Sequence, residues 1–272
     1  MSGYGVLTGF HAVEEAVRAA GNSAQGHSAA KNGMRLVFSK EGPRVRRILA
    51  MGKTLGIPCR QVPAAELDAL TAGLPPELRD HRGLALVLEN GTGVCASAPF
   101  APALEAFADW ARNQDSCLAL MLDCVTDPHN VGAVLRSADQ FGASAVLVPG
   151  SRSAADTAEP DGVIARSSSG ASAWVPLIRT ANLVRGVQRL KEAGFWVYGA
   201  EASGAPVCTT ALPPKTLFIL GSEGAGIARL LRETCDAFVS IPTSGRLDSL
   251  NVSVAAGILL YEFRRQMRAA EP

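Results

Sequence analysis

The stretch LDCVTDPHNVGAVLRSADQFGASAVLV, residues 122–148, contains the end of a strand, a polar turn, a helix and a second strand. Apolar residues lead up to Asp123, and helical spacing of apolar residues begins near Asn130. Ala145–Val148 is a short apolar run that is typical of a strand buried on both faces. The stretch therefore predicts a β-α-β unit with two parallel strands.

The same alternation continues to the end of the chain. The predicted strands are Cys117–Asp123, Ala145–Val148, Phe195–Ala200, Thr216–Leu220 and Phe238–Ile241. The predicted helices are Val131–Phe141, Asn182–Ala193, Ile227–Thr234 and Val252–Arg268. This order predicts an α/β domain with a mostly parallel sheet that helices cover on both faces.

Residues 1–90 predict a second, smaller α/β domain. Its expected elements are helices at His11–Ala20, at 43–56 and from Ala64, and strands at Met34–Ser39, Pro58–Val62 and Gly83–Leu88. Residues 21–33, GNSAQGHSAAKNG, predict a loop. Because residues 90–103 are rich in Gly, Ala, Ser and Pro, we expect a linker at 91–103 and a C-terminal domain at 104–272.

The composition limits the class of protein. The 272 residues are 47% hydrophobic, which suffices for real cores. We expect no membrane span, because no apolar run reaches about 18 residues, and no signal peptide, because the start has no basic region before an apolar core. The 6 cysteines form no CxxC pair, which favours a reducing cytoplasm and no metal site.

The net charge is only +1, but residues 31–60 are locally basic. Arg44, Arg46 and Arg47 lie on the helix predicted at 43–56, and Glu41 is the single acid of the segment. Such a stripe can hold a phosphate backbone by releasing counterions. A solvated helix face explains the same pattern, and the segment alone leaves both interpretations open.

The first motif with chemical content follows the strand that ends at Asp123. Asn130 is placed to cap the next helix, and Gly132 allows another group to approach closely. Arg136 lies nearly two turns further on, above the carboxyl edge of the sheet where ligands of such folds bind. An ordinary capped helix with a surface arginine remains the alternative.

The second motif is TLFILGSEGAGIARLLRETC, residues 216–235. Gly221, Gly224 and Gly226 predict a backbone loop that closely follows a nucleotide-like ligand, or else a tight connection from strand to helix. Glu223 within the loop suits a hydroxyl or an arginine better than a phosphate. The spacing G-x-x-G-x-G is not the dinucleotide fingerprint, which argues against a nicotinamide-dependent enzyme.

The third motif is FVSIPTSGRLDSLNVSVAAGILLYEFRRQ, residues 238–266. Pro242 follows the strand, and a polar loop then reaches Ser249 and Asn251. Either residue can cap the last helix, but so many polar groups exceed what capping needs. The helix itself is apolar nearly all round, so we expect it in the core or in a subunit interface.

In this order, the three motifs resemble those of the SpoU/TrmH branch of the SPOUT methyltransferase superfamily. The resemblance covers about residues 118–265 and consists of N-x-G-x-x-x-R, a G-x-E-G-x-G loop and S-L-N-V-S. DPHNVGAVLRSAD and SLNVSVA are especially similar to the subgroup that methylates a guanosine ribose in 23S rRNA. GFHAVEEAV and HRGLALVL resemble that subgroup's ribosomal-protein-like RNA-binding domain.

The resemblance implies a deep trefoil knot, a homodimer and transfer of a methyl group from S-adenosylmethionine to a ribose 2′-hydroxyl of RNA. The implied catalytic residues are Asn130, Arg136, Glu223, Ser249 and Asn251. The implied cofactor-binding residues are Ala200, Leu220, Gly221, Ile241, Leu250 and Ser253. Arg136 would orient the hydroxyl and stabilise its developing charge, since a guanidinium almost never loses its proton.

Two alternative functions are compatible with the same family resemblance. One is a transfer-RNA ribose as substrate, and the other is a non-catalytic RNA-binding or ribosome-assembly protein. The chain departs from the subgroup at 163–171, where Arg166 replaces the usual lysine as the expected RNA-binding residue, and at 21–33, which resembles an insertion.

Overall fold

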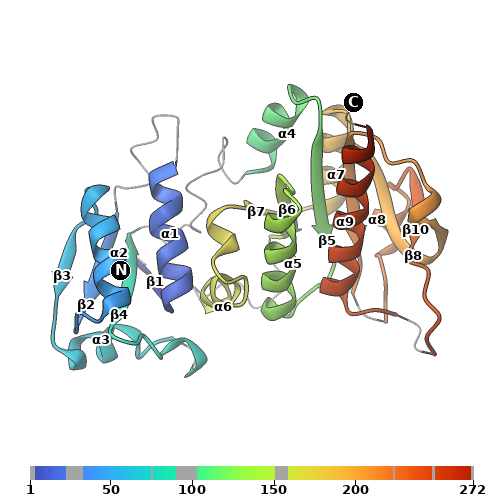
Figure 1. Cartoon of the computed structure of the whole chain (residues 1–272). Helices are drawn as coiled ribbons and strands as arrows, with labels where there is room; N and C mark the ends of the chain where they lie inside the picture. The colour runs from blue at the N-terminus through green and yellow to red at the C-terminus, as the bar shows by residue number, and fades with distance from the viewer. Residues whose placement is uncertain are drawn as a thin grey trace. The chain divides into compact units, whose positions relative to one another are not determined.

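The computed structural model describes residues 4–22, 33–74, 76–89, 103–150, 159–222, 224–246 and 249–270. The chain forms two compact units (Figure 1). The N-terminal unit comprises Met1–Pro99 and Ala155–Trp174, and the C-terminal unit comprises Phe100–Ala154 and Val175–Pro272. Residues 91–102 of the expected linker and 23–32 of the expected loop lie outside the described residues.

The division corrects the expected domain at 104–272, because its residues 155–174 belong to the N-terminal unit. Helix α6 (Glu159–Ser167) contributes Ala165 to the core of that unit. After the 3-10 turn η3 (Ala171–Ala173), the indole Nε1 of Trp174 donates to Oε2 of Glu15 at 2.8 Å. The composition of residues 155–174 does not indicate that they pack with the N-terminal unit, which is why the sequence did not reveal this division.

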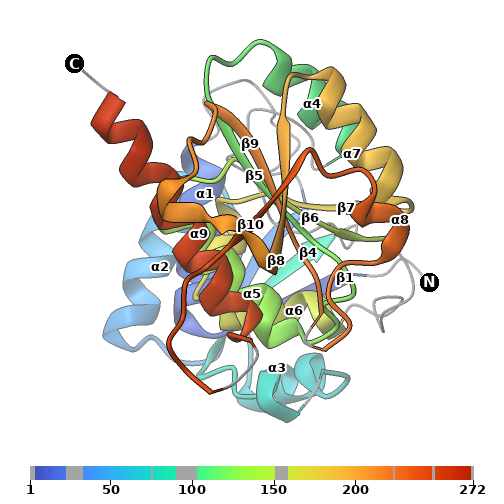
Figure 2. The same ribbon diagram turned by 90° about the vertical axis from the view of Figure 1, so that its right-hand side faces the viewer.

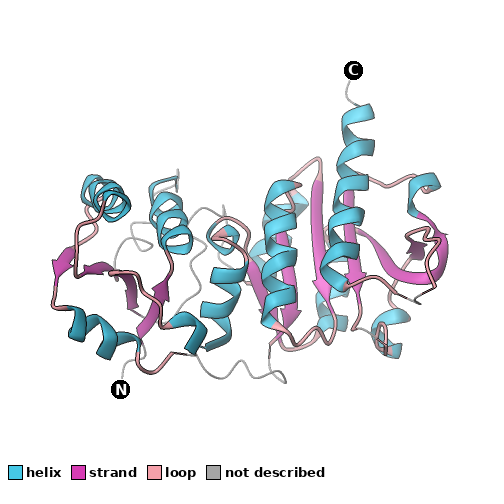
Figure 3. Cartoon of the chain, turned by 60° about the horizontal axis from the view of Figure 1, so that its bottom comes forward, coloured by secondary structure: helices cyan, strands magenta, loops and turns pink. Residues whose placement is uncertain are grey.

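The N-terminal unit is a four-stranded sheet with helices. The strand order is β1-β4-β2-β3, and only the β2–β3 pair is parallel. The strands are β1 (Tyr4–Thr8), β2 (Met34–Phe38), β3 (Cys59–Gln61) and β4 (Leu84–Glu89). The helices before α6 are α1 (Phe10–Asn22), α2 (Pro43–Thr54), α3 (Ala64–Thr71) and the 3-10 turn η2 (Pro76–Leu78). Figure 3 distinguishes these helices and strands by colour.

The C-terminal unit confirms the predicted parallel sheet. Its strand order is β10-β8-β9-β5-β6-β7, and every neighbouring pair is parallel. The strands are β5 (Cys117–Leu122), β6 (Ala145–Pro149), β7 (Leu177–Thr180), β8 (Trp196–Pro206), β9 (Lys215–Leu220) and β10 (Ala237–Ser240). Strand β7 was not predicted, because LIRT is only four residues long and half polar.

Helices cover both faces of this sheet, as predicted (Figure 2). Residues of α4 (Leu104–Arg112), α7 (Leu183–Glu192) and α8 (Arg229–Arg232) share one core cluster with alternate residues of β5, such as Met121. Because side chains alternate along a strand, the buried Leu118 and Leu120 face the other layer. That layer contains α5 (Pro128–Gln140) and α9 (Val252–Ala270), which lie side by side.

The start of α5 corrects one expectation. The N-cap is Asp127, whose side chain accepts the N–H of His129 at 2.9 Å, and Pro128 follows in the first turn. Asn130 therefore lies inside the helix and is not needed as its cap. Aspartate before a proline is a strong start signal, and it leaves the amide of Asn130 available for another interaction.

A close approach of two strands shapes the β8–β10 edge. A Cβ added at Gly204 would lie 2.6 Å from main-chain atoms of Phe238 and Val239, so only glycine fits. The register shifts between Phe238 and Val239. Among the described helices, none is long and apolar enough to cross a membrane.

Candidate functional site

The three motifs gather at the carboxyl edge of the C-terminal sheet. The turn at 123–127 follows β5, the glycine loop follows β9, and the polar loop from Ile241 follows β10. Since the strands are parallel, their carboxyl ends share one edge of the sheet, where α/β folds bind ligands. The motifs were predicted at the ends of separate strands, and the strand order brings them together.

A direct hydrogen bond joins the first motif to the third. Nδ2 of Asn251 donates to Oδ1 of Asn130 at 3.1 Å, across 121 residues of sequence. The amide oxygen of Asn251 accepts from the N–H of Ser253 at 2.9 Å and from the hydroxyl of Ser253 at 2.6 Å. Asn251 therefore caps α9 and at the same time orients the amide of Asn130.

Arg136 lies on the same helix as Asn130, with an exposed side chain. Ala133, its neighbour one turn earlier on the helix surface, faces α9. Arg136 therefore lies on the exposed surface of α5, beside the face that packs on α9. That Arg136 faces a ligand near the carboxyl edge of the sheet stays a prediction.

The glycine loop after β9 is folded tightly on itself. A Cβ added at Gly221 would lie 2.0 Å from the carbonyl carbon of Gly226, and the N–H of Gly226 donates to the carbonyl of Ser222 at 3.0 Å. Gly224 and Gly226 have φ of +86° and +67°, which favour glycine. Glu223 lies outside the described residues.

Most of the remaining predicted site residues lie in or next to these loops in the sequence, and Ala200 lies within β8. Leu220 is buried at the end of β9, and Ala200, Ile241 and Leu250 are partly buried. Ser249 is exposed next to Leu250, and Ser253 lies in the first turn of α9. The hydroxyl of Ser253 donates to the amide oxygen of Asn251.

Sequence reasoning missed Asp123, which directly follows β5. Its carboxylate is buried, and Oδ2 accepts the N–H of Ala228 at 2.7 Å. The other oxygen accepts from the thiol of Cys124 at 3.3 Å. Partial burial, and secondarily this carboxylate, raise the pKa of Cys124. The sequence signal that could have identified Asp123 is its carboxylate directly after a fully apolar strand.

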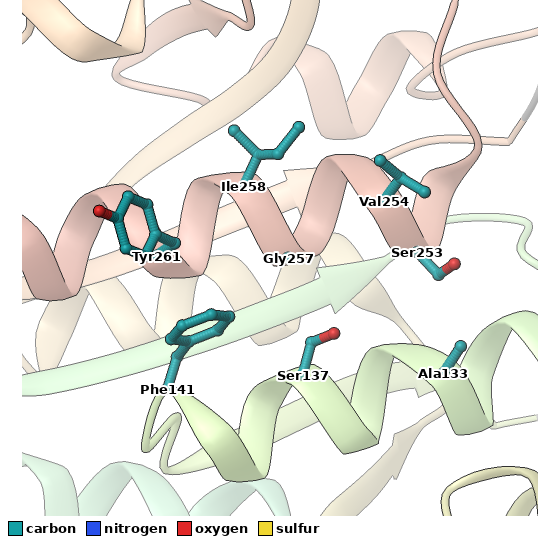
Figure 4. A pocket seen from close by; sticks show the side chains of 8 residues that line it. All are labelled: Ala133, Ser137, Phe141, Ser253, Val254, Gly257, Ile258 and Tyr261. Carbon is teal, nitrogen blue, oxygen red and sulfur yellow. The ribbon is translucent and has the colours of Figure 1, made fainter.

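A hollow of about 410 Å³ lies between α5 and α9 (Figure 4). It is lined by Ala133, Ser137, Phe141, Ser253, Val254, Gly257, Ile258 and Tyr261. Val254 and Tyr261 are 50% and 55% exposed, so the last helix is not buried all round within this chain. Figure 4 shows the ring of Tyr261 beside Phe141, and the ring centroids are 5.9 Å apart.

The basic residues predicted to bind RNA lie in the N-terminal unit. Arg44 and Arg47 on α2 approach the buried carboxylate of Glu14 at 3.6 and 3.3 Å, and Arg46 approaches Glu41 at 3.5 Å. The side chains of Arg46 and Arg47 are 70% exposed. The charges are thus held at the surface, although each has an acidic neighbour.

Arg166 occupies a different environment on α6. Its Nη1 atom is buried without a hydrogen-bond partner in the described part of the chain. The pKa of Asp80 is lowered mainly by a hydrogen bond from Arg82, with a smaller effect of the Arg166 charge. Arg166 is therefore partly turned inward. Within the same described residues, no group of three or more His, Cys, Asp or Glu is placed to hold a metal ion.

Comparison with known families identifies this arrangement. The model of the SpoU rRNA Methylase family matches residues 117–261, more than half of the chain, which include the turn, the glycine loop and the polar loop at the carboxyl edge. The chain belongs to the SpoU rRNA methylase family. A second model, RNA 2′-O ribose methyltransferase substrate binding, matches residues 6–77 of the N-terminal unit.

SpoU relatives match along nearly the whole chain. A 23S rRNA (guanosine-2′-O-)-methyltransferase, RlmB, from Pseudomonas syringae pv. tomato is 35% identical over 265 residues, 97% of this chain and 95% of that protein. An uncharacterized tRNA/rRNA methyltransferase from Borreliella burgdorferi is 35% identical over 86% of this chain and 99% of its own.

The fold of a solved SpoU protein matches as well. The SpoU methyltransferase AviRb from Streptomyces viridochromogenes, crystallised with the cofactor AdoMet, is 24% identical and superposes with a TM-score of 0.72. The match covers 98% of this chain and 91% of AviRb. The similarity confirms the predicted fold class for both parts of the chain.

The link between the two SpoU motifs can be broken without removing the helix cap. In Asn251→Asp, an oxygen replaces Nδ2 and faces Oδ1 of Asn130, while aspartate still caps α9. We expect a loss of about 1 kcal/mol of unfolding free energy, measured by urea denaturation. Asn130→Asp is the matched control, because a carboxylate there still accepts from Asn251. Equal stability of the two variants would contradict the assigned donor and acceptor.

Proposed function

We propose that this chain transfers a methyl group from S-adenosylmethionine to a ribose 2′-hydroxyl of RNA, with a guanosine of 23S rRNA as the first candidate. The hydrogen bond between Asn130 and Asn251 carries the proposal, because it joins two SpoU motifs that follow different strands of the parallel sheet. Membership of the SpoU rRNA methylase family supports the reaction. The RlmB relative, matched over 95% of its length, supports the substrate.

The residues at the carboxyl edge suit a flat, nucleoside-like cofactor. Gly221 packs against the main chain of Gly226, whereas a Cβ added at Gly224 or Gly226 would meet no described atom within 4 Å, so the main chain there is open to a close-fitting ligand. Gly221, Leu220, Ile241 and Leu250 would hold the cofactor, with Ala200 and Ser253 at its edges. When bound, S-adenosylmethionine supplies an electrophilic methyl group on a sulfonium.

The protein's part of the reaction is to orient the ribose hydroxyl. A hydroxyl is a weak nucleophile at neutral pH, and Arg136 orients it and stabilises the negative charge that develops on its oxygen. The guanidinium keeps its proton, so a phosphate of the substrate takes the hydroxyl proton. Asn130 offers Nδ2 as a donor because Asn251 occupies its Oδ1. Ser249 and Glu223 position the substrate.

Methyl transfer from labelled S-adenosylmethionine to unmodified 23S rRNA tests the proposal. Arg136→Ala should lower the rate about 100-fold or more, because charge stabilisation in the transition state is lost. Arg185→Ala, an exposed arginine on α7, is the matched control and should keep the wild-type rate. Mapping should find one 2′-O-methylated guanosine.

The alternatives predict other outcomes of the same assay. Label on transfer RNA alone would mean that the substrate is a transfer-RNA ribose and that the reaction is the proposed one. Cofactor binding without label on either RNA would favour an RNA-binding or ribosome-assembly protein. A wild-type protein that binds no S-adenosylmethionine would contradict the proposed methyltransferase activity.

RNA is the proposed partner of the exposed α2 surface. Arg44, Arg46 and Arg47 project from one helix of the unit that matches the substrate-binding model. Two of them are held by the carboxylate of Glu14, which reduces their freedom and keeps their charge at the surface. Arg166 would add a basic group from α6.

Reversal of Arg44, Arg46 and Arg47 to glutamate should weaken RNA binding at least tenfold, because each lost phosphate contact removes a counterion-release gain. Filter binding at several salt concentrations measures the affinity and its salt dependence. Cofactor affinity should stay at the wild-type value. The alanine triple variant guards against misfolding caused by repulsion from Glu14. Unchanged RNA affinity in both variants would mean that the basic face of α2 is a solvated helix face that does not bind RNA.

A cytoplasmic location, a trefoil knot and a homodimer complete the proposal. The proposed 23S rRNA substrate supports the cytoplasmic location, and the similarity of the fold to AviRb supports the knot. The hollow between α5 and α9 supports a second copy of this chain as its occupant. A two-fold interface must fit itself, and this patch combines a hollow with the half-exposed Val254 and Tyr261.

Val254→Glu tests the homodimer. The side chain is half exposed, so the variant should fold, but a charge within an apolar interface should halve the molar mass found by sedimentation equilibrium. Leu230→Glu replaces another exposed apolar residue (61%) outside the hollow and should leave the mass at twice that of the chain. A wild-type protein with the mass of one chain would refute the dimer.

A further inference from the structure

Asp123 contacts both ends of the glycine loop. Its N–H donates to the carbonyl of Leu220 at 2.8 Å, which extends the β5–β9 pairing by one residue. Its Oδ2 accepts the N–H of Ala228 at 2.7 Å. Leu220 and Ala228 are the residues on either side of the loop at 221–227. A single residue that directly follows β5 thus holds the entry and the exit of this loop.

The carboxylate is well placed to hold the loop firmly. Asp123 is only 5% exposed, and a buried carboxylate is stable only when donors satisfy it. Hydrogen bonds to a charged acceptor are shorter and stronger than neutral ones. The N–H of Ala228, just before α8, is one of the donors that a helix start leaves without a partner inside the helix.

The loop depends on such an external contact. Gly221, Gly224 and Gly226 give its main chain more freedom to lose on folding than any other residue type would. Within the described residues, the bridge between Ser222 and Gly226 is its internal main-chain pairing. Ile227 is buried in the core cluster and fixes the exit from one side.

We propose that Asp123 is a positioning residue that sets the shape of the glycine loop for S-adenosylmethionine. The same residue begins the turn that leads to Asn130 and Arg136, so it couples the cofactor loop to the helix that orients the ribose. This inference rests on the proposed function, which supplies the cofactor. Asp123 acts through the loop and does not touch the reacting atoms.

Asp236 provides a matched control within the same unit. Its Oδ2 accepts the N–H of Val197 at 2.8 Å, and its Oδ1 pairs with Lys191 at 2.6 Å. It therefore makes the same kind of bond from a carboxylate to the main chain. Val197 is the second residue of β8, at the amino end of the strand and away from the glycine loop.

The test compares Asp123→Ala, Asp123→Asn and Asp236→Ala in the full chain. Calorimetry gives the Kd for S-adenosylmethionine, steady-state kinetics give KM and kcat, and thermal scans give Tm. We expect Asp123→Ala to raise the cofactor Kd and KM about tenfold or more, as for loss of a charged hydrogen bond. Asp123→Asn should recover part of the affinity, because its amide oxygen still accepts. Asp236→Ala should lower Tm but keep the cofactor Kd within about twofold.

A cofactor Kd that stays within about twofold in Asp123→Ala, or rises as much in Asp236→Ala, would overturn the inference. Amide hydrogen exchange covers the case in which Asp123→Ala fails to fold. The N–H of Ala228 should exchange faster in Asp123→Asn than in wild type, and equal rates would also overturn it. Failure of the wild-type protein to bind S-adenosylmethionine would instead refute the proposed function.

Discussion

Helix α9 holds both ends of α5, and the arrangement of the site depends on this pairing. At one end, Asn251 donates to Asn130. At the other end, the guanidinium of Arg264 donates to the main-chain carbonyls of Phe141 and Gly142. The last carbonyls of a helix have no partner inside it and attract a cation. The two contacts fix α5 along its length, and with it the position from which Arg136 projects.

The pairing in turn requires a sheet that supports both helices. Strand β5 is buried along its whole length and lies between β9 and β6. Such a strand needs helices on both faces, which is possible when all neighbouring strands are parallel. The same parallel order brings the ends of β5, β9 and β10 to one edge. The location of the site is thus a consequence of how the core is buried.

Much of this could be predicted from the sequence, because apolar runs and glycine turns are local signals. Five strands of the C-terminal sheet and the three motifs follow from such signals. The cap at Asp127 was misassigned to Asn130, since both residue types favour that position. The bond between Asn130 and Asn251 and the contact between Asp123 and Ala228 depend on the strand order, which local patterns do not contain.

The segment that follows β6 shows the same limit at the scale of domains. Residues 155–174 lie inside the SpoU match at 117–261 but belong to the N-terminal unit. Val163 and Ile164 are buried there, and Trp174 donates to Glu15. The chain therefore passes between the units at 99–100, 154–155 and 174–175. Removing residues 1–99 would expose the apolar face of α6, so the C-terminal unit cannot be obtained by one cut in the sequence.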